Sequence, residues 1–135
     1  MTSRGIRNNN PGNLDKGSDW QGLAADQTDE RFCVFIAPVW GIRALAKVLL
    51  AYYAKHHLAT VREIIRRWAP PTENDSGAYV AAVSNRMGVN PDALLKLTER
   101  KFLKPLVEAI IQHENGSQPY DDATIDEALT KAGVA

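Results

Sequence analysis

The sequence predicts a mainly α-helical (α+β) domain that carries a small β element. Apolar residues recur at the i, i+3, i+4, i+7 spacing of helices over most of the chain from residue 38 onward. Turn-forming residues dominate residues 4–13, and short β-type runs lie between residues 20 and 36. The chain has 135 residues, of which 44% are apolar and 24% charged, so residues 1–135 should form one domain with its own hydrophobic core.

Composition narrows the classes of function. The formal net charge is zero, so the composition gives no support for nucleic-acid binding. The single Cys33, inside an apolar run, excludes an internal disulfide and should be a small buried residue. Three scattered histidines with this cysteine do not make a zinc site, and we expect no metal or organic cofactor. The N-terminus is polar and no signal peptide is recognisable, and no run approaches the ~18 apolar residues of a membrane span.

The N-terminal third should be irregular, followed by a hairpin. Residues 4–13, RGIRNNNPGN, predict consecutive turns; a mobile tail is the alternative, but carboxamides are suited to hydroxyl-rich and N-acetyl substrates. Residues 20–23 and 31–36 flank a polar connection and predict a small hairpin. Its loop is crowded by acids, most of which should only form turns, although Asp29 is a candidate second acid in a cleft.

Five or six helices should follow. Residues 38–53 are apolar around most of their circumference and predict the central buried helix. Thr60 and Glu63 form a capping box for a helix that ends at Ala69. The expected later helices are one opened by residues 72–76 and ended by Gly88, a short one from Asn90, one ending at Gly116, and a last one with Ile125, Ala128 and Leu129.

The helix that ends at Gly116 carries the main functional candidate. It should begin near residues 99–102, because Pro105 is tolerable only in a first turn. Glu114 then lies in the last turn of a buried helix, where partial desolvation and the negative end of the helix dipole both favour the protonated carboxyl. A glycosidase prepares its general acid in this way. The alternative is that Glu114 is a solvated residue at a helix end.

The segment LVEAIIQHENGSQPY, residues 106–120, resembles the part of lysozyme-like lytic transglycosylases in which a buried helix ends in the catalytic glutamate. Over nearly its full length the chain also resembles a family of phage-encoded virion proteins related to peptidoglycan hydrolases. The stretches that carry this resemblance are GIRNNNPGNL (5–14), WQGL (20–23), GIRALAKVLLAYY (41–53), RWAPPTENDSGAYV (67–80) and HENGSQPY (113–120).

The resemblance implies a lysozyme-like domain that cleaves the β-1,4 bond between N-acetylmuramic acid and N-acetylglucosamine, as a muramidase or a lytic transglycosylase. Glu114 would protonate the leaving oxygen. A second carboxylate, Glu73 first and Asp29 second, would permit hydrolysis. Without one, the acetamido group of the sugar would act, as in lytic transglycosylases. Glu73 and its neighbour Asp75 are alternatively caps of the next helix. The candidate substrate-binding residues are Asn9, Asn10, Asn13, Trp20, Asn74, Tyr79, Asn115 and Tyr120.

The expected partners are peptidoglycan glycan strands and other virion proteins. The expected location is the phage virion or the cytoplasm of the producing bacterium, with action in the periplasm or cell wall. The rival interpretation is a non-catalytic virion protein that binds glycan or only packs in the particle. In lysozyme-like enzymes the glutamate helix precedes the hairpin, whereas here the hairpin is near residue 30 and the helix near residue 110. A circular permutation would reconcile the two orders, because domain termini often lie close together.

Overall fold

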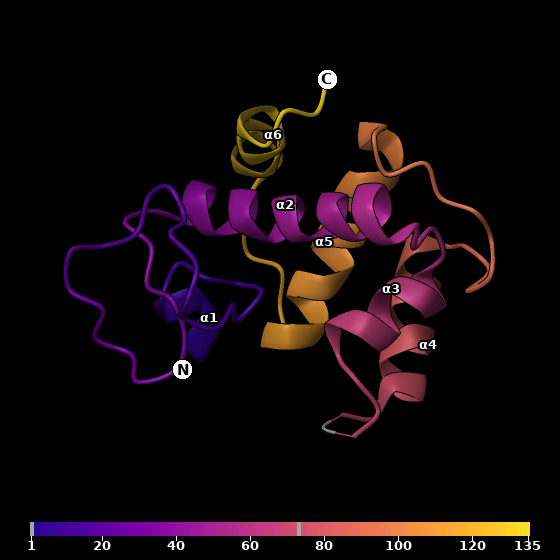
Figure 1. The fold of residues 1–135 in the computed structure, drawn as a ribbon, viewed down its shortest axis with the longest axis horizontal. Coiled ribbons are helices and arrows are strands. Elements are labelled where there is room, and N and C mark those ends of the chain that lie inside the picture. The colour runs from indigo at the N-terminus through magenta and orange to yellow at the C-terminus, as the bar shows by residue number, and fades with distance from the viewer. Residues whose placement is uncertain (1, 73) are drawn as a thin grey trace.

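A computed structural model describes residues 2–72 and 74–135, and the mainly α prediction is confirmed (Figure 1). The helices within these residues are α1 (Arg4–Arg7), α2 (Pro38–His56), α3 (Val61–Trp68), α4 (Ser76–Met87), α5 (Arg100–Asn115) and α6 (Asp122–Lys131). Helix α2 crosses the middle of the molecule in front of α5, with α6 on one side, α1 at one end, and α3 and α4 at the other (Figure 1). In the described part of the chain, none of these helices combines the length and the apolar character that crossing a membrane requires.

Helix α2 is the central buried helix, as its apolar circumference predicts. Pro38 occupies its first turn, where the missing N–H costs nothing, and His57 ends it in a left-handed conformation at φ 56°. Ile42, Leu45 and Leu49 are completely buried and pack in the main core with residues of the other long helices. The helix runs to His56, three residues beyond the predicted end at residue 53.

Local capping determines where α3 and α4 begin. The Thr60 hydroxyl accepts a hydrogen bond from the Glu63 backbone N–H at 3.1 Å, and the Glu63 carboxylate accepts one from the Ala59 N–H at 3.2 Å, so the capping box predicted from the sequence is present. Asp75 accepts a hydrogen bond from the Ala78 N–H at 3.0 Å and caps α4. The capping role considered for Asp75 is therefore the one it has.

Helix α5 begins at Arg100, within the predicted window, and ends before Gly116, which has a φ of 75°. Pro105 lies in the second turn, so the expectation that it occupies the first turn was wrong. Burial of the stripe that contains Leu106 and Ile110, both fully buried, offsets the hydrogen bond that the proline removes.

Three local predictions were wrong. Residues 4–7 form the short helix α1 instead of turns, because the Ser3 hydroxyl accepts the Ile6 N–H at 3.4 Å and caps it. Residues 90–99 form no helix: Asn90 accepts the Asp92 N–H at 2.8 Å in an Asx turn, and the Leu95 N–H donates to Ala59 at 2.7 Å. In place of the hairpin, the described residues form two isolated bridges, Asp15 with Phe32 and Leu23 with Phe35.

The asparagine-rich N-terminal loop is a fixed part of the fold and not a tail. The Asn10 side chain is fully buried; its Nδ2 donates to the carbonyls of Leu14 and Cys33 at 3.0 Å, and its Oδ1 accepts from the Leu14 N–H at 3.0 Å. Asn9 donates to the Phe35 carbonyl at 2.9 Å. A carboxamide at each position satisfies buried backbone groups that a loop without strands leaves unpaired. The loop therefore positions its residues as firmly as a helix would.

Candidate active site

Glu114 is the point at which three separate parts of the chain meet. It lies in the last turn of α5 and is partly buried. Its Oε2 accepts a hydrogen bond from the Tyr79 hydroxyl of α4 at 2.7 Å, and its Oε1 accepts one from Nδ2 of Asn13 in the N-terminal loop at 3.1 Å. The fold therefore brings together three residues that the sequence predicts as site residues.

Tyr79 is itself held from two sides. The side chain is 3% exposed, its oxygen accepts a hydrogen bond from the Trp68 indole Nε1 at 3.1 Å, and its ring stacks on the His113 ring with the centroids 3.8 Å apart. Burial, together with the adjacent Glu114 carboxylate, raises the pKa of Tyr79 well above its ordinary value. The phenol therefore keeps its proton at neutral pH and donates the hydrogen bond to Glu114.

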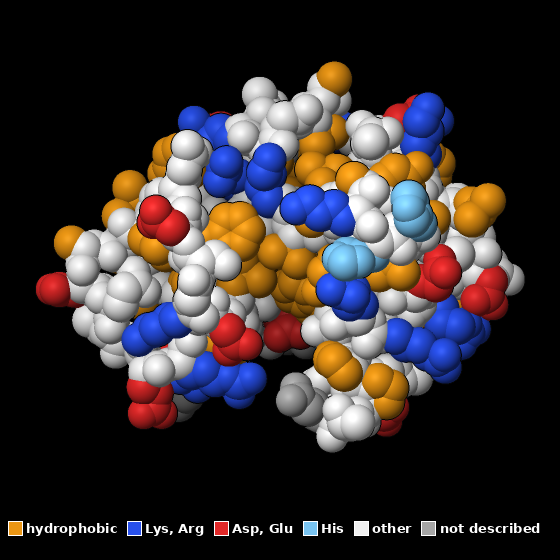
Figure 2. All heavy atoms as spheres, viewed as in Figure 1, with side chains coloured by type: hydrophobic (Ala, Val, Ile, Leu, Met, Phe, Trp, Pro, Cys, Tyr) orange, Lys and Arg blue, Asp and Glu red, His pale blue; other side chains and the backbone are white. Residues whose placement is uncertain are grey.

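A cleft of about 590 Å³ opens beside Glu114. Figure 2 shows the face of the molecule hollowed at its lower edge, between the N-terminal region and the region of α3 and α4, with acidic and apolar side chains at the inner end. The lining residues come from the N-terminal loop, the bridged segment, α2, α3 and the connection to α4. They are Gly12, Asn13, Leu14, Asp15, Arg31, Phe32, Val48, Tyr52, Trp68, Ala69, Asn74 and Glu114. Aromatic faces next to carboxamides and charged groups are a lining suited to a polar, ring-shaped ligand.

Asp15 is a cleft carboxylate that reasoning from the sequence missed. It pairs with Arg31 at 2.9 Å, and the two side chains are 65% and 64% exposed. Its bridge to Phe32 is what brings both residues to the cleft. Its position two residues after Asn13 was the available signal, because the loop that carries Asn13 to Glu114 also carries Asp15.

Of the two candidates for a second catalytic carboxylate, the structure describes Asp29. Glu73 lies outside the residues that the structure describes. Asp29 does not line the cleft; its carboxylate accepts hydrogen bonds from Arg4 at 2.6 and 2.7 Å, from Asn8 at 2.9 Å, and from the N–H groups of Arg31 and Phe32 at 2.9 Å. The Arg4 guanidinium, with these N–H donors, holds the pKa of Asp29 well below its usual range. Asp29 is placed to fasten the N-terminal helix to the bridged segment.

The predicted substrate-binding asparagines divide into two groups. Asn13 and Asn74 line the cleft, whereas Asn9 and Asn10 are consumed by hydrogen bonds to backbone carbonyls. The side chain of Asn115 is likewise occupied by hydrogen bonds within the protein. Its Nδ2 donates to the carbonyls of Pro11 at 2.8 Å and Ile111 at 3.0 Å, and its Oδ1 accepts from the Ser3 hydroxyl at 2.7 Å. Asn115 thus ties the loop to α5, whereas Asn9 and Asn10 tie it to the bridged segment.

Two of the predicted aromatic binders lie outside the cleft lining. Trp20 packs on the small cluster of Cys33, Phe35 and Ala44, and Tyr120 packs on the main core. Burial raises the pKa of Tyr120 to about 12, and the described residues give its hydroxyl no hydrogen-bond partner. Trp68, for which a core role was favoured, packs against the main core, is half-buried and also lines the cleft.

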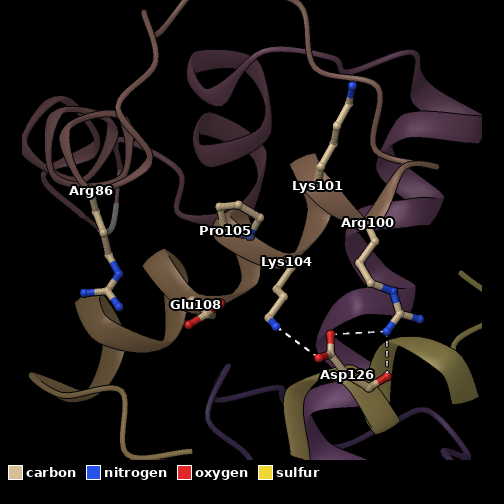
Figure 3. A pocket seen from close by; sticks show the side chains of 7 residues that line it. All are labelled: Arg86, Arg100, Lys101, Lys104, Pro105, Glu108 and Asp126. Carbon is tan, nitrogen blue, oxygen red and sulfur yellow. Dashed lines mark hydrogen bonds and ion pairs between the residues drawn. The ribbon is translucent and has the colours of Figure 1, made fainter. Parts of the chain in front are cut away.

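A second hollow, of about 510 Å³, lies between α4, α5 and α6 (Figure 3). Its basic side chains Arg100 and Lys104 are both paired with Asp126, at 3.2 and 3.1 Å. Glu108, which also lines it, accepts a hydrogen bond from Gln118 at 3.0 Å. The two ion pairs tie α5 to α6. Within residues 2–72 and 74–135, no three His, Cys, Asp or Glu side chains are grouped as metal ligands.

Comparison with known proteins gives one informative match. No protein-family model matches the chain. The chain is 41% identical over 122 residues to Protein P5 of Pseudoalteromonas phage PM2, and the match covers 87% of this chain and 74% of that protein.

Proposed function

This chain belongs to the family of Protein P5 of Pseudoalteromonas phage PM2, a bacteriophage protein, and we propose that it cleaves the glycan strands of peptidoglycan. The observation that carries the proposal is the setting of Glu114. Glu114 is fixed by a carboxamide and a phenol and lines a cleft that has aromatic and carboxamide side chains in its walls. General acids of glycosidases are positioned in this way beside the sugar they cleave.

In the proposed reaction Glu114 protonates the glycosidic oxygen between N-acetylmuramic acid and N-acetylglucosamine. A carboxyl group has about four lone-pair sites, so the two hydrogen bonds from Asn13 and Tyr79 leave a site on each oxygen for the transferred proton. Those two donors also restrict rotation of the carboxyl. A carboxyl group whose rotation is restricted loses less entropy when it protonates the leaving oxygen.

The described cleft favours the route of a lytic transglycosylase. Among the described lining residues the carboxylate other than Glu114 is Asp15, and Arg31 neutralises it. Asp15 is engaged with Arg31, and the acetamido route requires no second carboxylate. We infer that the acetamido oxygen of N-acetylmuramic acid attacks its own C1 as the glycosidic bond breaks. Glu114, now a carboxylate, then takes the proton of the C6 hydroxyl as that oxygen displaces the acetamido group and forms an anhydro end.

The proposed fold relation is a circularly permuted lysozyme-like domain. Its support is that the bridged pair Asp15 and Phe32 lies on the same cleft as Glu114, as the β element of a lysozyme lies beside its acid. The proposed site of action is the bacterial cell wall, reached from the phage particle or from the infected cell, with other particle proteins as partners.

The test is digestion of purified peptidoglycan, with mass spectrometry of the released fragments. Glu114→Gln keeps the shape of the side chain and removes the acid, so cleavage should fall by about 10²–10⁴-fold, the usual contribution of a general acid. Glu108→Gln, on the same helix but outside the cleft, is the matched control and should keep full activity. Fragments with anhydro-muramyl ends support the transglycosylase route, and reducing ends support hydrolysis.

The rival function is glycan binding without cleavage by a particle component. In that case the wild-type protein would co-sediment with peptidoglycan and release nothing, and Glu114→Gln would co-sediment equally well. That pair of results would end the enzymatic proposal.

A further inference from the structure

A directed chain of hydrogen bonds runs into Glu114 from the protein interior. The indole Nε1–H of Trp68 is a donor only, so the Tyr79 oxygen must accept at the 3.1 Å contact between them. The Tyr79 hydroxyl has one proton, and its oxygen lies 2.7 Å from Oε2 of Glu114, an ordinary O–H···O distance. The order of donors is therefore Trp68 to Tyr79 to Glu114.

We propose that Trp68 is a positioning residue of the active site: its indole N–H fixes the Tyr79 hydroxyl as a donor to Glu114, which keeps the proton of Glu114 on the cleft side of the carboxyl. This inference rests on the proposed function, since it assigns a role in proton donation. It assigns that role to a residue for which stacking on sugar or core packing was the expectation.

The physical reason lies in what Tyr79 would do without the indole. A phenol oxygen that accepts nothing can accept a hydrogen bond from a protonated carboxyl. The acidic proton of Glu114 would then be directed at the buried phenol and away from the glycosidic oxygen. With the indole donating to one lone pair of the Tyr79 oxygen, the phenol proton is directed to the other group within hydrogen-bond distance, Oε2 of Glu114.

Two further features keep this arrangement rigid. The His113 ring stacks on the Tyr79 ring at 3.8 Å with an interplanar angle of 29°, so the phenol cannot swing out of the chain of bonds. Tyr79 is 3% exposed, so competition from bulk water for its hydroxyl is small. Burial also raises the pKa of Tyr79, which favours the protonated phenol.

The experiment is a double-mutant cycle of Trp68→Phe and Tyr79→Phe, with kcat and KM measured on a soluble peptidoglycan fragment. Trp68→Phe keeps an aromatic ring in the cleft and removes the N–H. It should lower kcat roughly fivefold to tenfold, the effect of one lost hydrogen bond, and leave KM within about twofold. In the Tyr79→Phe background the same change should leave kcat unaltered, because no hydroxyl remains to be oriented.

If Trp68 instead stacks on the sugar, Trp68→Phe should raise KM and leave kcat unaltered. That result, or additive effects of the two substitutions on kcat, would overturn the proposal.

A second measurement needs no catalytic activity. The protein has three tryptophans, so its NMR spectrum contains three indole N–H resonances. Tyr79→Phe should move one of them upfield, and that resonance should be the one missing from Trp68→Phe. If no indole resonance responds to Tyr79→Phe, the hydrogen bond is absent and the proposal fails. If the resonance responds while the wild-type protein cleaves nothing, the bond order is supported and the proposed function fails on its own.

Discussion

Replacement of Gly41 by alanine should destabilise the protein, although the same change inside a helix ordinarily stabilises it. Gly41 lies in α2 directly against the N-terminal loop. A Cβ atom there would lie 1.8 Å from the Asn9 carbonyl oxygen and 2.8 Å from its carbonyl carbon. Both atoms are backbone, so no side-chain rotation can relieve the overlap. The loop has to move away from the helix.

The cost follows from what holds the loop in place. Moving it breaks hydrogen bonds that anchor it to the bridged segment: Asn9 Nδ2 to the Phe35 carbonyl, Asn10 Nδ2 to the Cys33 carbonyl, and the Phe35 N–H to the Asn8 carbonyl, each contributing about 1 kcal/mol. Alanine in place of glycine returns about 1 kcal/mol of helix propensity. The net loss should be about 2 kcal/mol, which for a domain of this size lowers Tm by about 7 °C.

Gly77→Ala is the matched control. Gly77 is also helical, in the first turn of α4, but the nearest atom to an added Cβ would be the Asp75 carboxylate oxygen at 3.7 Å, an ordinary contact. This substitution should raise stability by about 0.5 kcal/mol. Urea denaturation followed by circular dichroism measures both. A Gly41→Ala protein as stable as the wild type would show that the loop is not packed on α2 as described.

Two further predictions concern residues that the structure places outside the cleft. The lowered pKa of Asp29 means that its contribution to stability is present above the unfolded value of about 4 and is lost as pH falls below it. The Tm difference between wild type and Asp29→Asn should therefore shrink between about pH 4 and pH 2, and a difference independent of pH would contradict the ion pair with Arg4. Tyr120→Phe removes a buried hydroxyl that has no partner among the described residues, so stability should stay equal or rise by up to about 1 kcal/mol, with cleavage unchanged; a loss of cleavage would restore Tyr120 as a binding residue.

The helices could be predicted from sequence because their signals are local. The capping box at Thr60, the proline at the start of α2 and the glycine after α5 each act within one turn of helix. The failures have local causes as well. The Asx turn at Asn90 competes with helix formation, and the bridged segment pairs at single residues because its backbone donors bond to side chains such as Gln27, which accepts the Val34 N–H at 2.8 Å.

Which asparagines bond to backbone carbonyls and which one contacts Glu114 could not be predicted from the sequence. Asn9, Asn10 and Asn13 have the same side chain within five positions, and nothing in their spacing distinguishes them. Asn10 is buried among backbone carbonyls, while Asn13, with a left-handed φ of 51°, is turned toward α5. Only the packing of the loop on α2 and α5 determines which amide meets Glu114.

The sequence by itself determined that Glu114 lies at the end of a buried helix, because the apolar stripe and Gly116 act along one short stretch. The tertiary structure alone decided what surrounds that acid. Asn13 lies 101 residues away along the chain and Tyr79 lies 35 away. Hydrogen bonds over such separations form only after the helices have packed and the loop has closed, so their direction is a property of the folded core and has no signature in any local pattern.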